Sequence, residues 1–153
     1  MLISCSRRND SGNDIMDIAT IFAIQELDSA TTFTDPNGVV SIGDSLIRYV
    51  IDPKQIFEGA LTDRNARNIL ITVDSLHDPY LVPAYHLVLN NEMETVAIIR
   101  SDMRVLAIEN GLITAEIPTH APSSPLYYCD ECRDTVKYKL VRGELILNNP
   151  VLK

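Results

Sequence analysis

Short runs in which apolar and polar residues alternate occupy most of the chain, and this period-two pattern is typical of half-buried β-strands. From residue 68 onward such runs follow one another closely and are separated by turn residues. This succession predicts an antiparallel meander. The predicted strands are residues 69–73, 80–89, 95–100, 104–109, 112–117, 136–141 and 144–147.

Two dipeptides predict tight hairpins within the meander. Asn110-Gly111 supplies the positive φ that a type I′ turn needs at both central positions, and Arg142-Gly143 marks a second turn. A two-residue loop at the first site fixes the register, and a core face of Leu106, Ile108, Ile113, Ala115 and Ile117 follows from it. The register pairs Glu109 with Leu112, Ile108 with Ile113, Leu106 with Ala115, Tyr138 with Leu147 and Leu140 with Leu145.

The first half of the chain contains the one pattern with helical spacing. Asp14 is a candidate N-cap, and apolar residues over 15–27 recur at near-helical intervals, so we expect a helix there. The alternate positions over 18–26 and the Ile-rich composition also fit a strand, which is the alternative. Strands are expected at 31–34, 39–42 and 46–51, and one or two helical turns over 54–61. Pro83 lacks a backbone N–H, so it should mark an edge, a bulge or the start of a strand.

Composition supports one folded domain. The chain has 153 residues, of which 46% are hydrophobic and 22% are charged, enough apolar material for one sizeable core. We therefore expect an α+β fold that is mainly β, an antiparallel meander or sandwich with one N-terminal helix. A polar N-terminal tail over 1–13 should precede a globular, strand-rich domain over 14–153.

Charge and hydropathy narrow the range of partners. The net charge is -8, and the densest basic cluster is only Lys137, Lys139 and Arg142, so nucleic acid is not an expected partner. No apolar run approaches the roughly 20 residues of a membrane-spanning helix. A protein partner or self-association is the expected mode of interaction.

The first residues carry a short membrane-anchor motif. Leu2-Ile3-Ser4-Cys5, followed by a polar stretch, resembles a bacterial lipobox, in which the cysteine becomes the lipidated N-terminus. The resemblance implies lipidation at Cys5 and a bacterial cell envelope location. The basic and apolar regions of a signal peptide do not precede it, so an apolar N-terminal tip that packs on the domain is the alternative.

Cys129-Asp130-Glu131-Cys132 is the motif most suggestive of chemistry. A CxxC turn brings two thiols close enough for a disulfide, for thiol redox chemistry or for two zinc ligands. The intervening carboxylates should raise the thiol pKa values, which disfavours redox catalysis. Zinc would need two more ligands, and the candidates are His120, the histidine nearest in sequence, and Cys5, the only other thiol. We expect a disulfide or plain thiols, with zinc held by Cys129 and Cys132 as the alternative.

Other catalytic signatures are lacking in the sequence. The histidines His77, His86 and His120 lack a metalloprotease spacing, and no phosphate-binding glycine loop occurs. His86 lies within a strand-like run, where a structural role is expected. These observations favour a non-catalytic binding, structural or assembly domain without a cofactor, such as a lipoprotein-like accessory protein of the bacterial envelope. A thiol-redox or zinc protein and a small hydrolase with a dispersed site are the alternatives.

Overall fold

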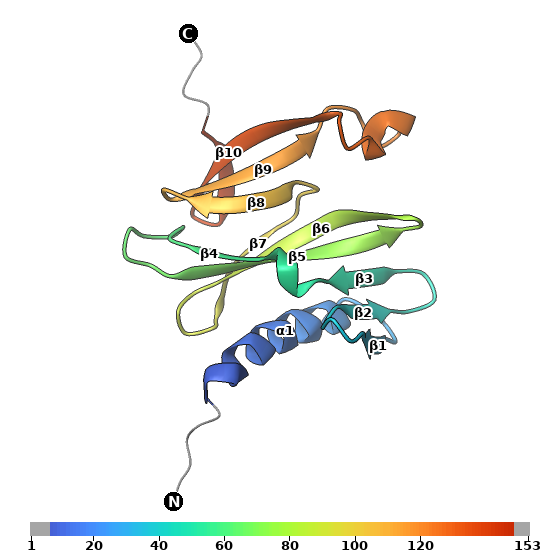
Figure 1. Cartoon of the computed structure of the whole chain (residues 1–153), viewed down its shortest axis with the longest axis horizontal. Coiled ribbons are helices and arrows are strands. Elements are labelled where there is room, and N and C mark those ends of the chain that lie inside the picture. The colour runs from blue at the N-terminus through green and yellow to red at the C-terminus, as the bar shows by residue number, and fades with distance from the viewer. Residues whose placement is uncertain (1–6, 149–153) are drawn as a thin grey trace, which may run out of the picture.

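A computed structural model describes residues 7–148, with side chains from residue 14 onward. One α-helix, α1 (Arg7–Gln25), precedes two antiparallel sheets (Figure 1). The larger sheet has seven strands in the order β1-β2-β3-β5-β6-β7, with β4 paired to β5, and the smaller has the order β11-β10-β9-β8. The strands are β1 (Thr31–Thr34), β2 (Val40–Gly43), β3 (Arg48–Ile51), β4 (Ile56–Gly59), β5 (Asn68–His77), β6 (Tyr80–Leu89), β7 (Thr95–Ile99), β8 (Arg104–Glu109), β9 (Leu112–Pro118), β10 (Arg133–Val141) and β11 (Glu144–Leu147).

The layers are helix, large sheet and small sheet. Helix α1 packs against one face of the large sheet, and the small sheet packs against the other face (Figure 1). The expectation of an α+β fold that is mainly β, with antiparallel sheets and one N-terminal helix, is therefore confirmed, and of the two predicted arrangements, meander or sandwich, the sheets are packed as a sandwich. Within the described residues, no helix is long and apolar enough to cross a membrane.

Strand β5 separates the two cores. Its odd-numbered side chains from Ile69 to Val73 join the core under α1, and Leu70 joins the core between the sheets. Strand β6 alternates in the same way, with Tyr85 and Leu87 facing the helix and Val88 facing the small sheet. Because both faces of these strands are covered, their sequences are nearly continuous apolar runs.

The two predicted hairpin turns are present. Asn110 and Gly111 have φ values of 55° and 78°, and Arg142 and Gly143 have φ values of 53° and 81°. All predicted pairs of the second hairpin are observed, as are Glu109 with Leu112 and Ile108 with Ile113. Pro83 lies opposite Asp74 where the register between β5 and β6 shifts, so of the three predicted alternatives the bulge is the one observed.

The predicted core position of Leu106 is wrong. A bulge in β8 pairs Val105 with Ala115 and Ala107 with Thr114, so Leu106 has no partner in β9. Val105 takes the buried position, whereas Leu106 is 45% exposed. A single inserted residue moves the following side chain to the other face, and the alternation in sequence cannot locate such an insertion.

Two element boundaries also differ from the prediction. The helix begins at Arg7 and ends at Gln25, so Asp14 lies inside it and is not its N-cap. Once the apolar turns have packed, extension toward the N-terminus adds one hydrogen bond for each residue fixed. The helical turns expected over 54–61 shrink to one 3-10 turn at Pro53–Gln55, and β4 follows because its backbone pairs with β5.

Gly59 allows the two sheets to approach each other at one end of the sandwich. A Cβ atom added at position 59 would lie 2.8 Å from the Cβ atom of Ile108 in β8, well inside van der Waals contact. Because the crowded atom belongs to the branch point of Ile108, rotation of that side chain cannot relieve the overlap. Strands β4 and β8 can therefore approach this closely only with glycine at position 59.

Gly59→Ala is expected to lower the free energy of unfolding by about 1 to 3 kcal/mol, the usual cost of overpacking. Chemical denaturation followed by circular dichroism measures this change. In a double-mutant cycle, Ile108→Gly removes both the Cβ and the Cγ2 atoms that meet the new methyl group, so the double variant should lose less than the sum of the two single losses. Additive losses would contradict the proposed contact.

Candidate functional site

Three loops meet at one end of the sandwich and enclose an open groove of about 930 Å³. The loops are the segment after β4, the β8–β9 turn and the β10–β11 turn, and all three lie on the same side of the molecule (Figure 1). A smaller hollow of about 310 Å³ adjoins the groove and shares Thr62, Leu140 and Arg142 with it. Hollows of this size are large enough for small organic ligands.

Asn68 holds the first of these loops in place. Its side chain is completely buried at the start of β5. Its Oδ1 atom accepts hydrogen bonds from the backbone N–H of Leu61 at 2.9 Å, from the backbone N–H of Thr62 at 3.0 Å and from Thr62 Oγ1 at 3.2 Å. Its Nδ2 group donates to the carbonyl oxygen of Leu89 at 3.2 Å. One amide side chain thus fixes the loop wall to the central strand pair.

The groove carries an excess of positive charge. Its walls contain Arg64, Lys139 and Arg142, and the only carboxylate among the described lining residues is that of Asp63. None of the three cationic side chains forms an ion pair with a carboxylate of the described residues. The whole chain has a net charge of -8, so the sign of the local charge in the groove is opposite to that of the chain.

A second group of polar side chains is buried between the sheets. Thr72 and His86 are paired across β5 and β6, and Thr72 Oγ1 lies 2.9 Å from His86 Nδ1. Burial lowers the pKa of His86 to about 4, although the Ser101 backbone and the Asp102 carboxylate favour the protonated ring. The imidazole is therefore neutral at physiological pH, and its Nε2 atom has no hydrogen-bond partner among the described residues.

Asp74 follows Thr72 on the same face of β5. Its carboxylate is almost fully buried, and Oδ2 accepts a hydrogen bond from Gln55 Nε2 at 3.2 Å. Burial raises the pKa of Asp74 to about 6, and the charge of Asp52 adds to the effect, while the Gln55 bond and Arg104 oppose it. Neither of the two hollows has a histidine in its walls, so they provide no support for a hydrolase centred on His86.

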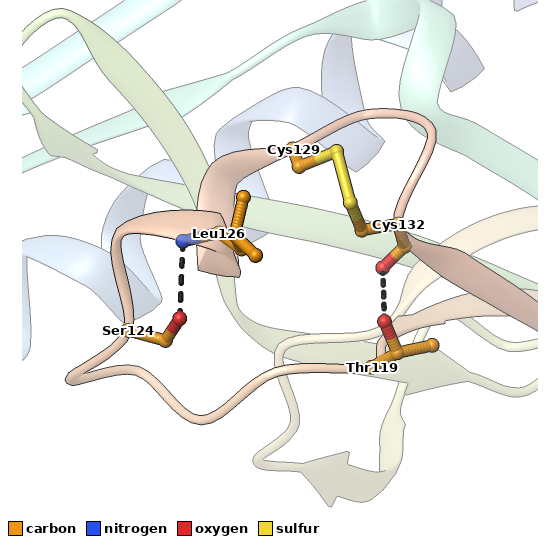
Figure 2. The surroundings of a disulfide bond; sticks show 5 residues. All are labelled: Thr119, Ser124, Leu126, Cys129 and Cys132. Carbon is orange, nitrogen blue, oxygen red and sulfur yellow. Dashed lines mark hydrogen bonds between the residues drawn. A yellow bond between two sulfur atoms is a disulfide. The ribbon is translucent and has the colours of Figure 1, made fainter.

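The loop between β9 and β10 contains the CxxC motif. Cys129 and Cys132 form a disulfide with Cα atoms 5.1 Å apart, and the loop is also held by Thr119 Oγ1, which donates to the Cys132 carbonyl oxygen at 2.9 Å (Figure 2). Ser124 caps the 3-10 turn at Pro125–Tyr128 by accepting from the Leu126 N–H at 3.1 Å (Figure 2).

Of the predicted site residues, the structure describes Cys129 and Cys132 but not Cys5. The two predicted metal ligands, Cys129 and Cys132, are bonded to each other, and the described residues contain no group of three or more His, Cys, Asp or Glu side chains placed to hold a metal ion. Zinc at this pair stays a prediction for the reduced thiols. Cys5 lies outside the described residues, so its lipidation also stays a prediction.

The comparisons with known proteins are negative. Searches with protein-family models, with curated proteins and with solved structures found no match for this chain.

The residues that organise the groove were missed at the sequence level. Asn68 comes directly before the apolar run of β5, where a polar residue is equally typical of a loop. Lys139 and Arg142 belong to a basic cluster in the sequence, but Arg64 joins them only because the loop after β4 folds toward the β10–β11 turn. The missing signal is a contact between segments far apart in sequence.

Asn68→Ala is expected to lower the free energy of unfolding by about 1 to 3 kcal/mol, because it leaves buried backbone donors without a partner. Urea denaturation measures the loss. Asn90→Ala is the matched control, because Asn90 caps an exposed turn through the N–H groups of Glu92 and Glu94. Water can replace those bonds, so a control loss as large as that of Asn68→Ala would contradict the assigned role.

Asp74→Asn is expected to stabilise the fold by about 3 kcal/mol near neutral pH and by much less at about pH 4. The native carboxyl group keeps its proton up to about pH 6, whereas the unfolded one loses it near 3.8. The contribution of Asp74 to the free energy of unfolding is therefore fully present below 3.8, the pKa of the unfolded chain, and is lost as the pH rises through 6. Asparagine keeps the acceptor for Gln55 and has no charge to bury.

The contribution of His86 to the free energy of unfolding has the opposite pH dependence. The native ring has a pKa of about 4 against an ordinary 6.5, so its contribution to stability is lost as the pH falls through this window. Asp74 partly cancels this loss in the wild-type protein. Urea denaturation across the window should show that Asp74→Asn loses stability more steeply on acidification than the wild type, and parallel profiles would contradict the assignment.

Proposed function

We propose that the protein is a non-catalytic assembly domain that self-associates by strand addition at β1. The observation that carries this proposal is the free edge of the larger sheet. Strand β1 is the first strand of that sheet, it pairs only with β2 among the described strands, and all four of its residues are exposed. An exposed edge strand offers unpaired N–H and C=O groups to another strand.

The hydrogen-bond register shows which backbone groups point outward. The Asp35 N–H donates to the Val39 carbonyl oxygen at 3.0 Å, and hydrogen-bonded pairs alternate along an antiparallel ladder. Phe33 is therefore bonded to its partner in β2, and the backbone groups of Thr32 and Thr34 point away from the sheet. A second strand would find two donors and two acceptors on this edge.

The side chains of β1 do not protect the edge. Natural sheets shield exposed edges with charged residues, proline or bulges, and Thr31–Thr34 has none of these. The side chain of Phe33 is 65% exposed, and Leu46 in the neighbouring β2–β3 turn is 90% exposed. An uncharged edge also avoids the like-charge repulsion that two copies of an acidic chain would otherwise meet at their contact.

The register favours a second copy of the chain as the added strand. If two β1 strands pair in antiparallel orientation around a two-fold axis at Phe33, Thr32 of each copy faces Thr34 of the other. These pairs are the ones with outward backbone groups, so they form the hydrogen bonds. The two Phe33 side chains then lie on one face as a non-hydrogen-bonded pair, the closer type of cross-strand pair.

Thr32→Pro is expected to weaken self-association at least tenfold, because proline removes an outward N–H group and places its ring in the path of the second strand. The fold should survive, since this N–H group makes no bond to β2. Thr32→Ala is the matched control, because it removes the same side chain and keeps the N–H group. Sedimentation equilibrium measures the dissociation constants, and circular dichroism verifies folding.

Two outcomes would overturn the proposal. A wild-type protein that stays monomeric at the highest reachable concentration excludes self-association. Equal association of wild-type and Thr32→Pro proteins places the interface elsewhere. Phe33→Lys provides a second variant. It should also favour the monomer, because it places two positive charges opposite each other across the two-fold axis.

A further inference from the structure

We infer that the groove at the end of the sandwich is a binding site for an amphipathic anion, a small molecule with an apolar body and a phosphate, sulfate or carboxylate head. This site is independent of the proposed assembly edge, because β1 and the loop after β4 lie on opposite sides of the molecule (Figure 1). The inference depends on the charge, the apolar walls and the rigidity of the groove.

The charge of the groove favours an anionic head. Arg64, Lys139 and Arg142 are exposed in its walls, and Asp63 has the only carboxylate there within residues 7–148, so this part of the lining has three positive charges and one negative charge. Guanidinium groups bind phosphate, sulfate and carboxylate groups through paired hydrogen bonds, and ammonium groups add a strong point charge. The amide side chains of Asn110 and Asn148 provide uncharged hydrogen-bonding groups in the same walls.

The walls also favour an apolar body. Between the cations, the groove is lined by aliphatic side chains from the small sheet and from the loop after β4, namely Ile108, Leu112, Leu140 and Val141 in the sheet and Leu61 in the loop. Inorganic ions alone would leave this surface in contact with water. A ligand with an aliphatic or aromatic portion would cover it and gain the free energy of apolar burial.

The groove is preformed. Asn68 fixes the loop wall through three accepted hydrogen bonds, and the contact of Gly59 with Ile108 sets the distance between the sheets at the base of that loop. Arg142 is held in a tight hairpin turn and lines both the groove and the adjoining hollow. A preformed site binds without the entropic cost of ordering its loops.

The test is a titration of the full chain with octyl phosphate below its micelle concentration, followed by amide chemical shifts in two-dimensional NMR spectra. We expect saturable shifts at Thr62, Gly111 and Arg142. Octyl sulfate and octanoate distinguish the possible head groups. Octyl glucoside, which has the same tail without a charge, and inorganic phosphate, which has no tail, should both bind at least tenfold more weakly.

The matched variants are Lys139→Gln and Lys137→Gln. Both lysines are exposed on the same strand and the same face of the small sheet, but only Lys139 lines the groove. Lys139→Gln should weaken octyl phosphate binding about tenfold, whereas Lys137→Gln should leave it unchanged. Arg64→Gln should act like Lys139→Gln from the opposite wall, and binding should weaken as salt is added.

Three results would overturn the inference. Equal binding of octyl glucoside and octyl phosphate would show that charge plays no part. Inorganic phosphate binding as tightly as octyl phosphate would exclude an amphipathic ligand. Equal losses in Lys137→Gln and Lys139→Gln would indicate diffuse attraction to the surface. Thr32→Pro leaves the groove intact, so octyl phosphate binding to this variant separates failure of the groove from failure of the assembly edge.

Discussion

Burial of both faces of the β5–β6 strand pair is the constraint on which the rest of the structure depends. A sheet whose central strands are apolar on both faces must be covered on both faces to keep that surface from water. Helix α1 covers one face, and the four-stranded sheet covers the other. The seven-stranded sheet therefore needs both neighbouring layers, and the order of the elements in the chain supplies one before it and one after it.

The polar residues of β5 divide its length into parts with different roles. Asn68 begins the strand, and its side chain accepts hydrogen bonds from the loop after β4 and donates one to β6. Thr72 and Asp74 occur later, where the polar groups between the sheets are only partly paired and where two pKa values are displaced by burial. The strand thus combines an end that stabilises structure with a region whose stability responds to acidity.

Sequence reasoning succeeded where the information is local. The Asn-Gly and Arg-Gly turns determine their own backbone conformation, and the alternation beside them determines the register of β10 and β11. It failed at Leu106 and at β4, where pairing with another strand decides the outcome. The groove was beyond prediction for the same reason, because Arg64 and Lys139 meet only after both sheets have formed. Pro83 is an intermediate case, because the residue alone predicts an edge, a bulge or a strand start, and only pairing with β5 decides that a bulge forms opposite Asp74.

The φ value of 53° at Arg142 makes the β10–β11 turn a place where conformational preference and charge oppose each other. Outside glycine, asparagine and aspartate, a left-handed backbone costs roughly 1 to 2 kcal/mol, and the neighbouring β8–β9 turn avoids this cost by using asparagine. A substitution of asparagine for Arg142 would relax the hairpin and remove a guanidinium group from the groove. Selection for thermal stability alone would therefore drive this position toward asparagine, and an arginine retained among natural variants would be a sign that the charge is under selection.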